Sequence, residues 1–157
     1  MKLVFSNNDF FALVAQELAD NGKVRFRVKG VSMQPLLRNE RDEVLVEKDP
    51  DSLKKGDIVL FRFHGGYILH RIYAVQDGVY RIKGDNTYGA KEYCRREDIL
   101  GKVTRIYRKK TGSSQEEPAQ YLDQDPYTFK WNFVARFWRF RCSIYQVLYA
   151  IKRRLFS

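Results

Sequence analysis

The stretch DIVLFRFHGGYILHRIYAVQDGVYRIK, residues 57–83, decides the fold. It contains three runs of apolar and β-branched residues, separated by Gly65-Gly66 and Asp77-Gly78. Two-residue loops of this kind join neighbouring antiparallel strands. The stretch therefore predicts a meander of three antiparallel strands.

Strand-like segments also lie on both sides of this meander. Residues 23–29 alternate apolar and basic side chains, and similar patterns occur at 43–48 and 99–108. Before them, residues 8–21 have apolar positions at helical spacing and end at Asn-Gly, a helix stop. The sequence predicts a mainly β fold, an antiparallel and barrel-like sheet with a short N-terminal helix.

Length and charge restrict the class of protein. The 157 residues suffice for one domain with its own core. There are 29 Lys and Arg against 19 Asp and Glu, a net charge of +10, so an anionic partner is plausible. The first 22 residues lack the pattern of an export signal, and no stretch has the apolar length of a membrane span. We therefore expect a cytoplasmic protein.

The cysteines and histidines give no sign of a metal or cofactor. Cys94 and Cys142 are far apart, without a CxxC motif, and the chain has 2 His. A zinc site needs more ligands than these residues offer. We expect no metal and no cofactor, and a reducing compartment without disulfides.

The two predicted loops fix which residues face each other across the meander. The first pairs Phe61 with His70, which places His70 in a row of apolar side chains. The second places Asp85 directly opposite His70, within reach of an imidazole–carboxylate hydrogen bond. Such a pair either serves acyl-transfer chemistry with a nearby serine, or is a structural hydrogen bond on one face of the sheet.

A serine with the character of a nucleophile follows the first predicted strand. In VKGVSMQPLL, residues 28–37, Ser32 lies between a glycine and a proline. Serine in such a place usually satisfies its own backbone in a turn. The spacing does not show that Ser32 reaches His70, so both interpretations stay open at this point.

Four ordered motifs carry a resemblance to a known family. The chain resembles the signal peptidase family, whose serine peptidase clan also contains LexA-like repressors. The motifs are GVSMQPLL (30–37), LKKGDIVLF (53–61), HRI (70–72) and KGDN (83–86). Each motif is weak alone, and their order makes them specific together. The resemblance implies a signal peptidase-like β core over about half of the chain.

The same resemblance assigns roles to single residues. It implies Ser32 as nucleophile and His70 as general base, as in the endoplasmic-reticulum and archaeal branch, where histidine replaces the bacterial lysine. It makes Asp85 the first choice for the third member of the triad, with Glu92 in reserve. Gly30 stands where the family often has a serine that donates to the oxyanion, so the oxyanion hole would rest on backbone N–H groups, chiefly that of Ser32. Met33, which follows the nucleophile, is expected at the substrate.

The C-terminal part has a different composition. Residues 1–107 are expected to form the peptidase-like domain, 108–126 a polar linker, and 127–157 a basic amphipathic helix. The apolar stripe of this helix consists of Phe133, Phe137, Phe140, Ile144, Val147, Ile151 and Leu155. Residues 128–155 suit an anionic membrane surface, or else pack on the domain or a partner. Nucleic acid is an unlikely partner, because no recognition module accompanies the charge.

The function expected from these features is that of a serine endopeptidase. It would cleave a leader or signal-like segment from a precursor peptide or protein in trans, through an acyl-enzyme on Ser32. The alternative is a LexA-like or catalytically inactive regulatory module of the same fold. The chain contains neither the Ala-Gly nor the Cys-Gly dipeptide at which LexA-like proteins commonly cleave themselves. That absence favours cleavage in trans.

Overall fold

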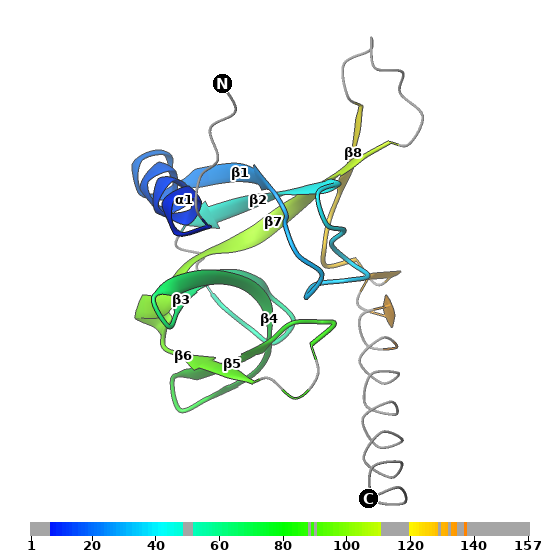
Figure 1. Ribbon diagram of the computed structural model, residues 1–157. Helices are drawn as coiled ribbons and strands as arrows, with labels where there is room; N and C mark the ends of the chain where they lie inside the picture. Colours follow the sequence, from blue (N-terminus) through cyan, green and yellow to red (C-terminus); the bar gives the residue numbers. More distant parts are fainter. Residues whose placement is uncertain are drawn as a thin grey trace, which may run out of the picture.

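The computed structural model describes residues 7–48, 52–87, 89, 91–110, 120–128, 130, 131, 133, 134 and 137. Its described part is an antiparallel sheet accompanied by one α-helix (Figure 1). The elements in chain order are α1 (Asn7–Asn21), β1 (Lys23–Arg27), β2 (Asp42–Lys48), β3 (Ile58–Phe63), β4 (Gly66–Gln76), β5 (Val79–Lys83), β6 (Glu92–Cys94), the 3₁₀ turn η1 (Arg96–Asp98), β7 (Ile99–Lys109) and β8 (Tyr121–Gln124).

The sheet confirms the expected mainly β class but is open. Its strands follow the order β1-β2-β7-β3-β4-β5-β6, and β8 pairs with β7 beside this path. Within the described residues β1 and β6 end the sheet and do not pair with each other, so the barrel-like expectation was wrong on closure. No helix in the described ranges has the length and apolar character that crossing a bilayer requires.

The N-terminal helix lies where its periodicity predicts. It ends at Gly22, whose φ of +71° is in the left-handed region and whose N–H donates to the Leu18 carbonyl over 3.1 Å. Val14 and Leu18 are buried against β1, and Figure 1 shows α1 beside β1 and β2. The helix thus covers one edge region of the sheet.

The first hairpin differs from the prediction by one residue in its turn. The turn residues are His64 and Gly65, with φ of 48° and 77°, rather than Gly65-Gly66. Both values are typical of a type I′ turn. Val59 consequently faces His70, where Phe61 was expected. The partner of His70 on β3 thus differs from the predicted one by two residues. Because side chains two residues apart lie on the same face of a strand, His70 still lies among apolar side chains.

The second hairpin has the predicted turn but not the predicted register. Asp77 and Gly78 have φ of 51° and 73°, and Gln76 pairs with Val79 as expected. A β-bulge between Ile72 and Ala74 then shifts the ladder by one residue. Asp85 is therefore not opposite His70, and the predicted direct pair of these two residues was wrong.

Strand β3 runs between two buried clusters. Ile58 and Leu60 pack with α1, β1 and β2 in the larger cluster. Val59 and Phe61 pack with side chains of β4, β5 and β6 in the smaller one. Burial on both faces explains why this strand reads as a continuous apolar run.

Two short strands, β6 and β8, were not predicted. Strand β6 has three residues, and β8 (sequence YLDQ) has four, too few for a periodicity to emerge. Strand β8 lies inside residues 108–126, where we expected a linker, and β7 also extends to Lys109. Residues 121–124 therefore belong to the sheet through their pairing with β7.

The segment after β8 is anchored to the domain at its start. The Tyr127 hydroxyl donates to the Val103 carbonyl over 2.6 Å and accepts the Ile58 N–H over 3.2 Å. Trp131 packs against the larger cluster. By contrast, Phe133 and Phe137 are 62% and 60% exposed. Most of the amphipathic helix expected over 127–157 lies outside the described residues.

Candidate functional site

Ser32 lies in a tight turn between β1 and β2. Gln34 N–H donates to the Val31 carbonyl over 3.1 Å, so Ser32 occupies the second position of a β-turn. Its side chain is half-buried. Among the described residues the Ser32 N–H has no hydrogen-bond partner, which leaves a backbone donor at the expected nucleophile. This is the arrangement that an oxyanion hole requires.

A buried ion pair fixes the loop that carries Ser32. The loop closes where Val28 N–H donates to the Asp42 carbonyl over 2.9 Å. The Asp42 carboxylate receives Arg108 Nη2 over 2.7 Å, and Arg108 Nη2 also donates to the Leu36 carbonyl over 2.7 Å. Both charged side chains are buried. Arg108, near the C-terminal end of β7, therefore holds the loop that carries Ser32 in place.

The loop after β5 contacts the turn of Ser32 directly. Asn86 N–H donates to the Ser32 carbonyl over 2.7 Å, and Asn86 Nδ2 donates to the Val31 carbonyl over 3.2 Å. Two consecutive carbonyls of the turn that contains Ser32 thus accept hydrogen bonds from one residue. The Gly-Asp-Asn motif therefore acts as a backbone clamp on Ser32.

Gly84 brings His70 and Ser32 to the same place. A Cβ atom at Gly84 would lie 2.7 Å from the Ser32 carbonyl oxygen and 2.9 Å from His70 Nε2. Real Cβ atoms do not approach other atoms so closely, so only glycine allows both groups to reach this point. The structure therefore brings together two of the predicted site residues, Ser32 and His70.

Glu92 is the carboxylate that contacts His70. Its Oε2 lies 3.3 Å from His70 Nδ1, and both side chains are buried. A proton on Nδ1 directed at this carboxylate leaves Nε2 free of a proton and turned toward Gly84. Burial lowers the pKa of His70 from 6.5, and the charge of Glu92 opposes this decrease. His70 is therefore neutral at pH 7 and able to accept a proton.

Asp85, the predicted third member, pairs with Arg71 instead. Its oxygens receive Arg71 Nη2 over 2.8 Å and Arg71 Nε over 2.9 Å, and both side chains are buried. Arg71 Nη1 also donates to the Gly56 carbonyl over 2.7 Å. The β-bulge in β4 is the physical reason, because it shifts the register by one residue, so that Gly84 and not Asp85 follows in line with His70. Asp85 thus anchors the loop that clamps Ser32.

Gly30 and Met33, the other predicted site residues, also lie near Ser32. Gly30 has a φ of +106°, and its N–H is already donated to Asn39 Oδ1 over 2.7 Å. It therefore provides the bend before Ser32 rather than a free donor. Met33 is buried in the larger cluster. Both residues line the same cavity as Ser32.

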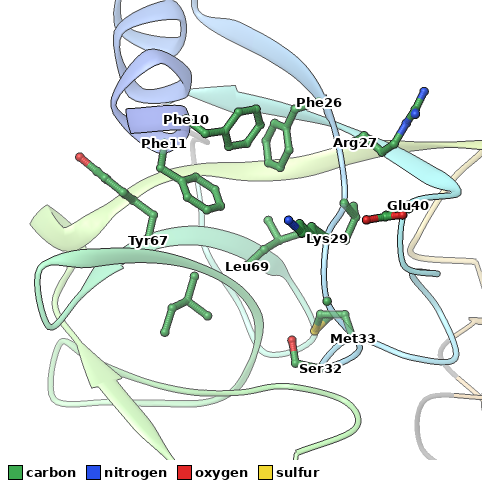
Figure 2. Close-up of a pocket in the computed structure, with 13 residues that line it drawn as sticks. Phe10, Phe11, Phe26, Arg27, Lys29, Ser32, Met33, Glu40, Tyr67 and Leu69 are labelled. Atoms are coloured by element: carbon green, nitrogen blue, oxygen red, sulfur yellow. The ribbon is translucent and has the colours of Figure 1, made fainter. Parts of the chain in front are cut away.

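That cavity has a volume of about 780 Å³ and opens beside Ser32 (Figure 2). Residues 26–30 form one wall, and residues 67–69 of β4 form another. In the described part of the chain β1 pairs only with β2, and residues 67–70 pair only with β3. Each wall therefore presents an unpaired strand edge, to which an extended peptide can add.

The sequence alone makes Glu92 only the second choice for the carboxylate beside His70, because it does not predict strand β6. Glu92 pairs with Ile82 across β5 and β6, on the sheet face that contains His70. The sequence signal for this carboxylate is an acidic residue in a short segment of alternating polar and apolar residues, Glu92–Cys94. Without the register of β4, that signal could not outweigh the apparent pairing with Asp85.

One comparison with known proteins gives a family match. The model of a family described as Peptidase S24-like matches residues 4–104, more than half of the chain. The matched range contains Ser32, His70 and Glu92. No curated protein matches the chain.

Proposed function

Because this chain belongs to the Peptidase S24-like family, which is a family of serine peptidases, we propose that it is itself an active peptidase. Ser32 is the nucleophile, His70 the general base, and Glu92 the residue that orients His70. This assignment makes the protein a His-type member, in which histidine takes the place of the lysine base. Asp85 is a positioning residue in this proposal.

The reaction follows from the positions of these groups. Ser32 Oγ attacks the carbonyl carbon of the scissile peptide bond while its proton moves to His70 Nε2. Glu92 stabilises the imidazolium that forms, and the Ser32 N–H stabilises the oxyanion. His70 then returns the proton to the leaving amine, which departs and leaves an acyl-enzyme on Ser32. Water, deprotonated by the same imidazole, releases the acyl product.

One observation supports the proposal most strongly. The Ser32 carbonyl and His70 Nε2 both approach the point at which Gly84 would have a side chain. A purely structural histidine–carboxylate pair has no need to place its second ring nitrogen, Nε2, beside a serine turn. The approach of His70 Nε2 to the backbone of the Ser32 turn, together with the family membership, favours catalysis over an inactive regulatory module.

The substrate that fits this site is an extended polypeptide. The cavity beside Ser32 runs between the open edge of β1 and the part of β4, residues 67–70, that does not pair with β5. Backbone hydrogen bonds to such edges bind a peptide in its β conformation with little regard to sequence. We propose that a precursor peptide or protein enters the cavity in trans and loses its leader or signal-like segment.

A cleavage assay with a complex peptide mixture tests this function. The purified wild-type protein is incubated with a proteome-derived peptide mixture, and new termini are identified by mass spectrometry. We expect new termini that are absent with Ser32→Ala and present with Ser52→Ala, a matched control at an exposed serine outside the cavity. The same termini from Ser32→Ala would contradict the proposal and favour a binding or regulatory module.

We also propose that the C-terminal segment binds an anionic membrane surface. Phe133 and Phe137, one helical turn apart, expose most of their side chains, although Trp131 before them is packed on the domain. Large exposed aromatic residues beside basic ones are typical of helices that lie at a membrane interface. The enzyme would then meet its substrate at that surface.

A further inference from the structure

The cavity beside Ser32 has a second end that the proposed reaction does not use. Figure 2 shows Ser32 and Met33 at one end and Phe10, Phe11 and Phe26 at the other. The rings at that end come from α1 and β1, two elements that the chemistry at Ser32 does not involve.

The aromatic side chains at this end form a continuous wall, which we call the aromatic wall: Phe10, Phe11, Phe26 and Tyr67. Phe26 lies 5.9 Å from Phe10 and 6.2 Å from Phe11 between ring centroids, both edge to face. Phe11 lies 5.7 Å from Tyr67 on β4. Phe10, Phe11 and Tyr67 are only partly buried, and all four line the cavity. The wall thus presents aromatic surface to whatever enters.

The spacing along β4 relates this wall to the scissile bond. Tyr67 precedes His70 by three residues of the same strand. At about 3.3 Å per residue the separation along the strand is roughly 10 Å, which an extended peptide covers with three residues. A substrate side chain that reaches the aromatic wall therefore belongs to the third or fourth residue from the bond that Ser32 attacks.

The chemistry of the cavity decides which side chain fits there. Its far end is lined by the aromatic wall, whereas the charged residues that line other parts of it, Arg27, Lys29 and Glu40, have exposed side chains. A large apolar side chain gains free energy on leaving water, and aromatic rings contribute further edge-to-face contacts. A small or charged side chain at the same position gains neither.

We propose that the aromatic wall is a specificity subsite, which takes a bulky apolar side chain of the polypeptide substrate three or four residues from the scissile bond. This inference rests on the proposed function, because the cavity is continuous with Ser32 and flanked by the two open strand edges. It also assigns a role to α1, which contributes two of the four rings.

Kinetics with paired peptides test the subsite. Short Ala/Ser peptides differ only in Phe or Ala at the third or fourth residue from the cleaved bond. We expect the wild type to cleave the Phe peptides with a KM roughly tenfold or more lower at similar kcat, because the contact is present before the transition state. Phe11→Ala should abolish that preference. Phe63→Ala, a half-buried aromatic outside the cavity, should keep it even where it lowers stability as much.

A binding experiment separates this inference from the proposed reaction. Ser32→Ala in the full chain is irradiated with Ala/Ser peptides that carry one p-benzoylphenylalanine, and crosslinked residues are identified by mass spectrometry. We expect crosslinks at Phe10, Phe11, Phe26 or Tyr67. Cleavage without a preference for Phe, or crosslinks elsewhere, overturns the subsite and leaves the peptidase intact. Crosslinks at the wall without any Ser32-dependent cleavage overturn the peptidase and leave a peptide-binding site.

Discussion

His70 Nδ1 lies 3.3 Å from Glu92 Oε2, and both side chains are buried. This contact joins β4 to β6 across the intervening strand β5. A carboxylate in this position selects the tautomer in which Nε2 accepts a proton, and it stabilises the imidazolium formed during the reaction. In the mechanism that we propose, Glu92, and not Asp85, is therefore the carboxylate that orients His70.

Two isosteric substitutions distinguish these acidic residues. Glu92→Gln removes the charge beside His70, and we expect kcat to fall roughly 10²–10⁴-fold. Asp85→Asn leaves Arg71 buried without a charged partner, so we expect a loss of stability of about 3 kcal/mol and a smaller loss of kcat in the folded protein. Urea unfolding and kcat measured on both variants check this ordering. A greater loss of kcat in Asp85→Asn would contradict it.

The pH dependence of kcat/KM follows from the pKa of His70. Protonated His70 cannot accept the Ser32 proton, so activity should fall as the pH decreases through the pKa of His70. Burial places that pKa below 6.5, and the acidic limb should therefore have an apparent pKa below 6.5. Glu92→Gln removes a charge that raises this pKa, so its acidic limb should move to still lower pH. An acidic limb above 6.5 in the wild type would contradict the neutral buried base.

Gly84→Ala should separate the serine from its base. The new methyl group would meet the Ser32 carbonyl and His70 Nε2 at less than van der Waals distance, and the carbonyl belongs to the backbone and cannot rotate away. We expect a loss of peptidase activity greater than any loss of helix and sheet signal by circular dichroism. Gly66→Ala is the matched control, because its Cβ would meet nothing closer than 3.7 Å. Equal activity of both variants would contradict the geometry.

Membrane binding should depend on residues beyond the anchored start of the C-terminal segment. Truncation after Asn132 retains Tyr127 and Trp131, which pack on the domain, removes the exposed Phe133 and Phe137, and should abolish sedimentation with anionic vesicles. Replacing Lys152, Arg153 and Arg154 by Gln should weaken binding without abolishing it, since each basic residue contributes about 1 kcal/mol. Unchanged binding after truncation would contradict the membrane proposal.

The fold was predictable where the sequence pattern is local. The alternation in β1, the apolar runs of β3 and β4 and the turn at Asp77-Gly78 predicted strands that the structure confirms. The bulge in β4 has no comparable signal, because it results from how neighbouring strands twist and pack. Because of the bulge, Asp85 is not opposite His70, and Glu92 is the acidic residue that contacts it. Ser32 and His70 were predictable from motifs, whereas their carboxylate partner depended on this register.

The rate at which Ser32 reacts with a fluorophosphonate tests the central claim most directly. The probe forms a covalent bond only with an activated serine, and peptide mass spectrometry locates the adduct. We predict a single adduct on Ser32 in the wild type, formation roughly 10²-fold or more slower in His70→Asn, and no adduct in Ser32→Ala. An adduct on another serine, or an equal rate in His70→Asn, would contradict the account.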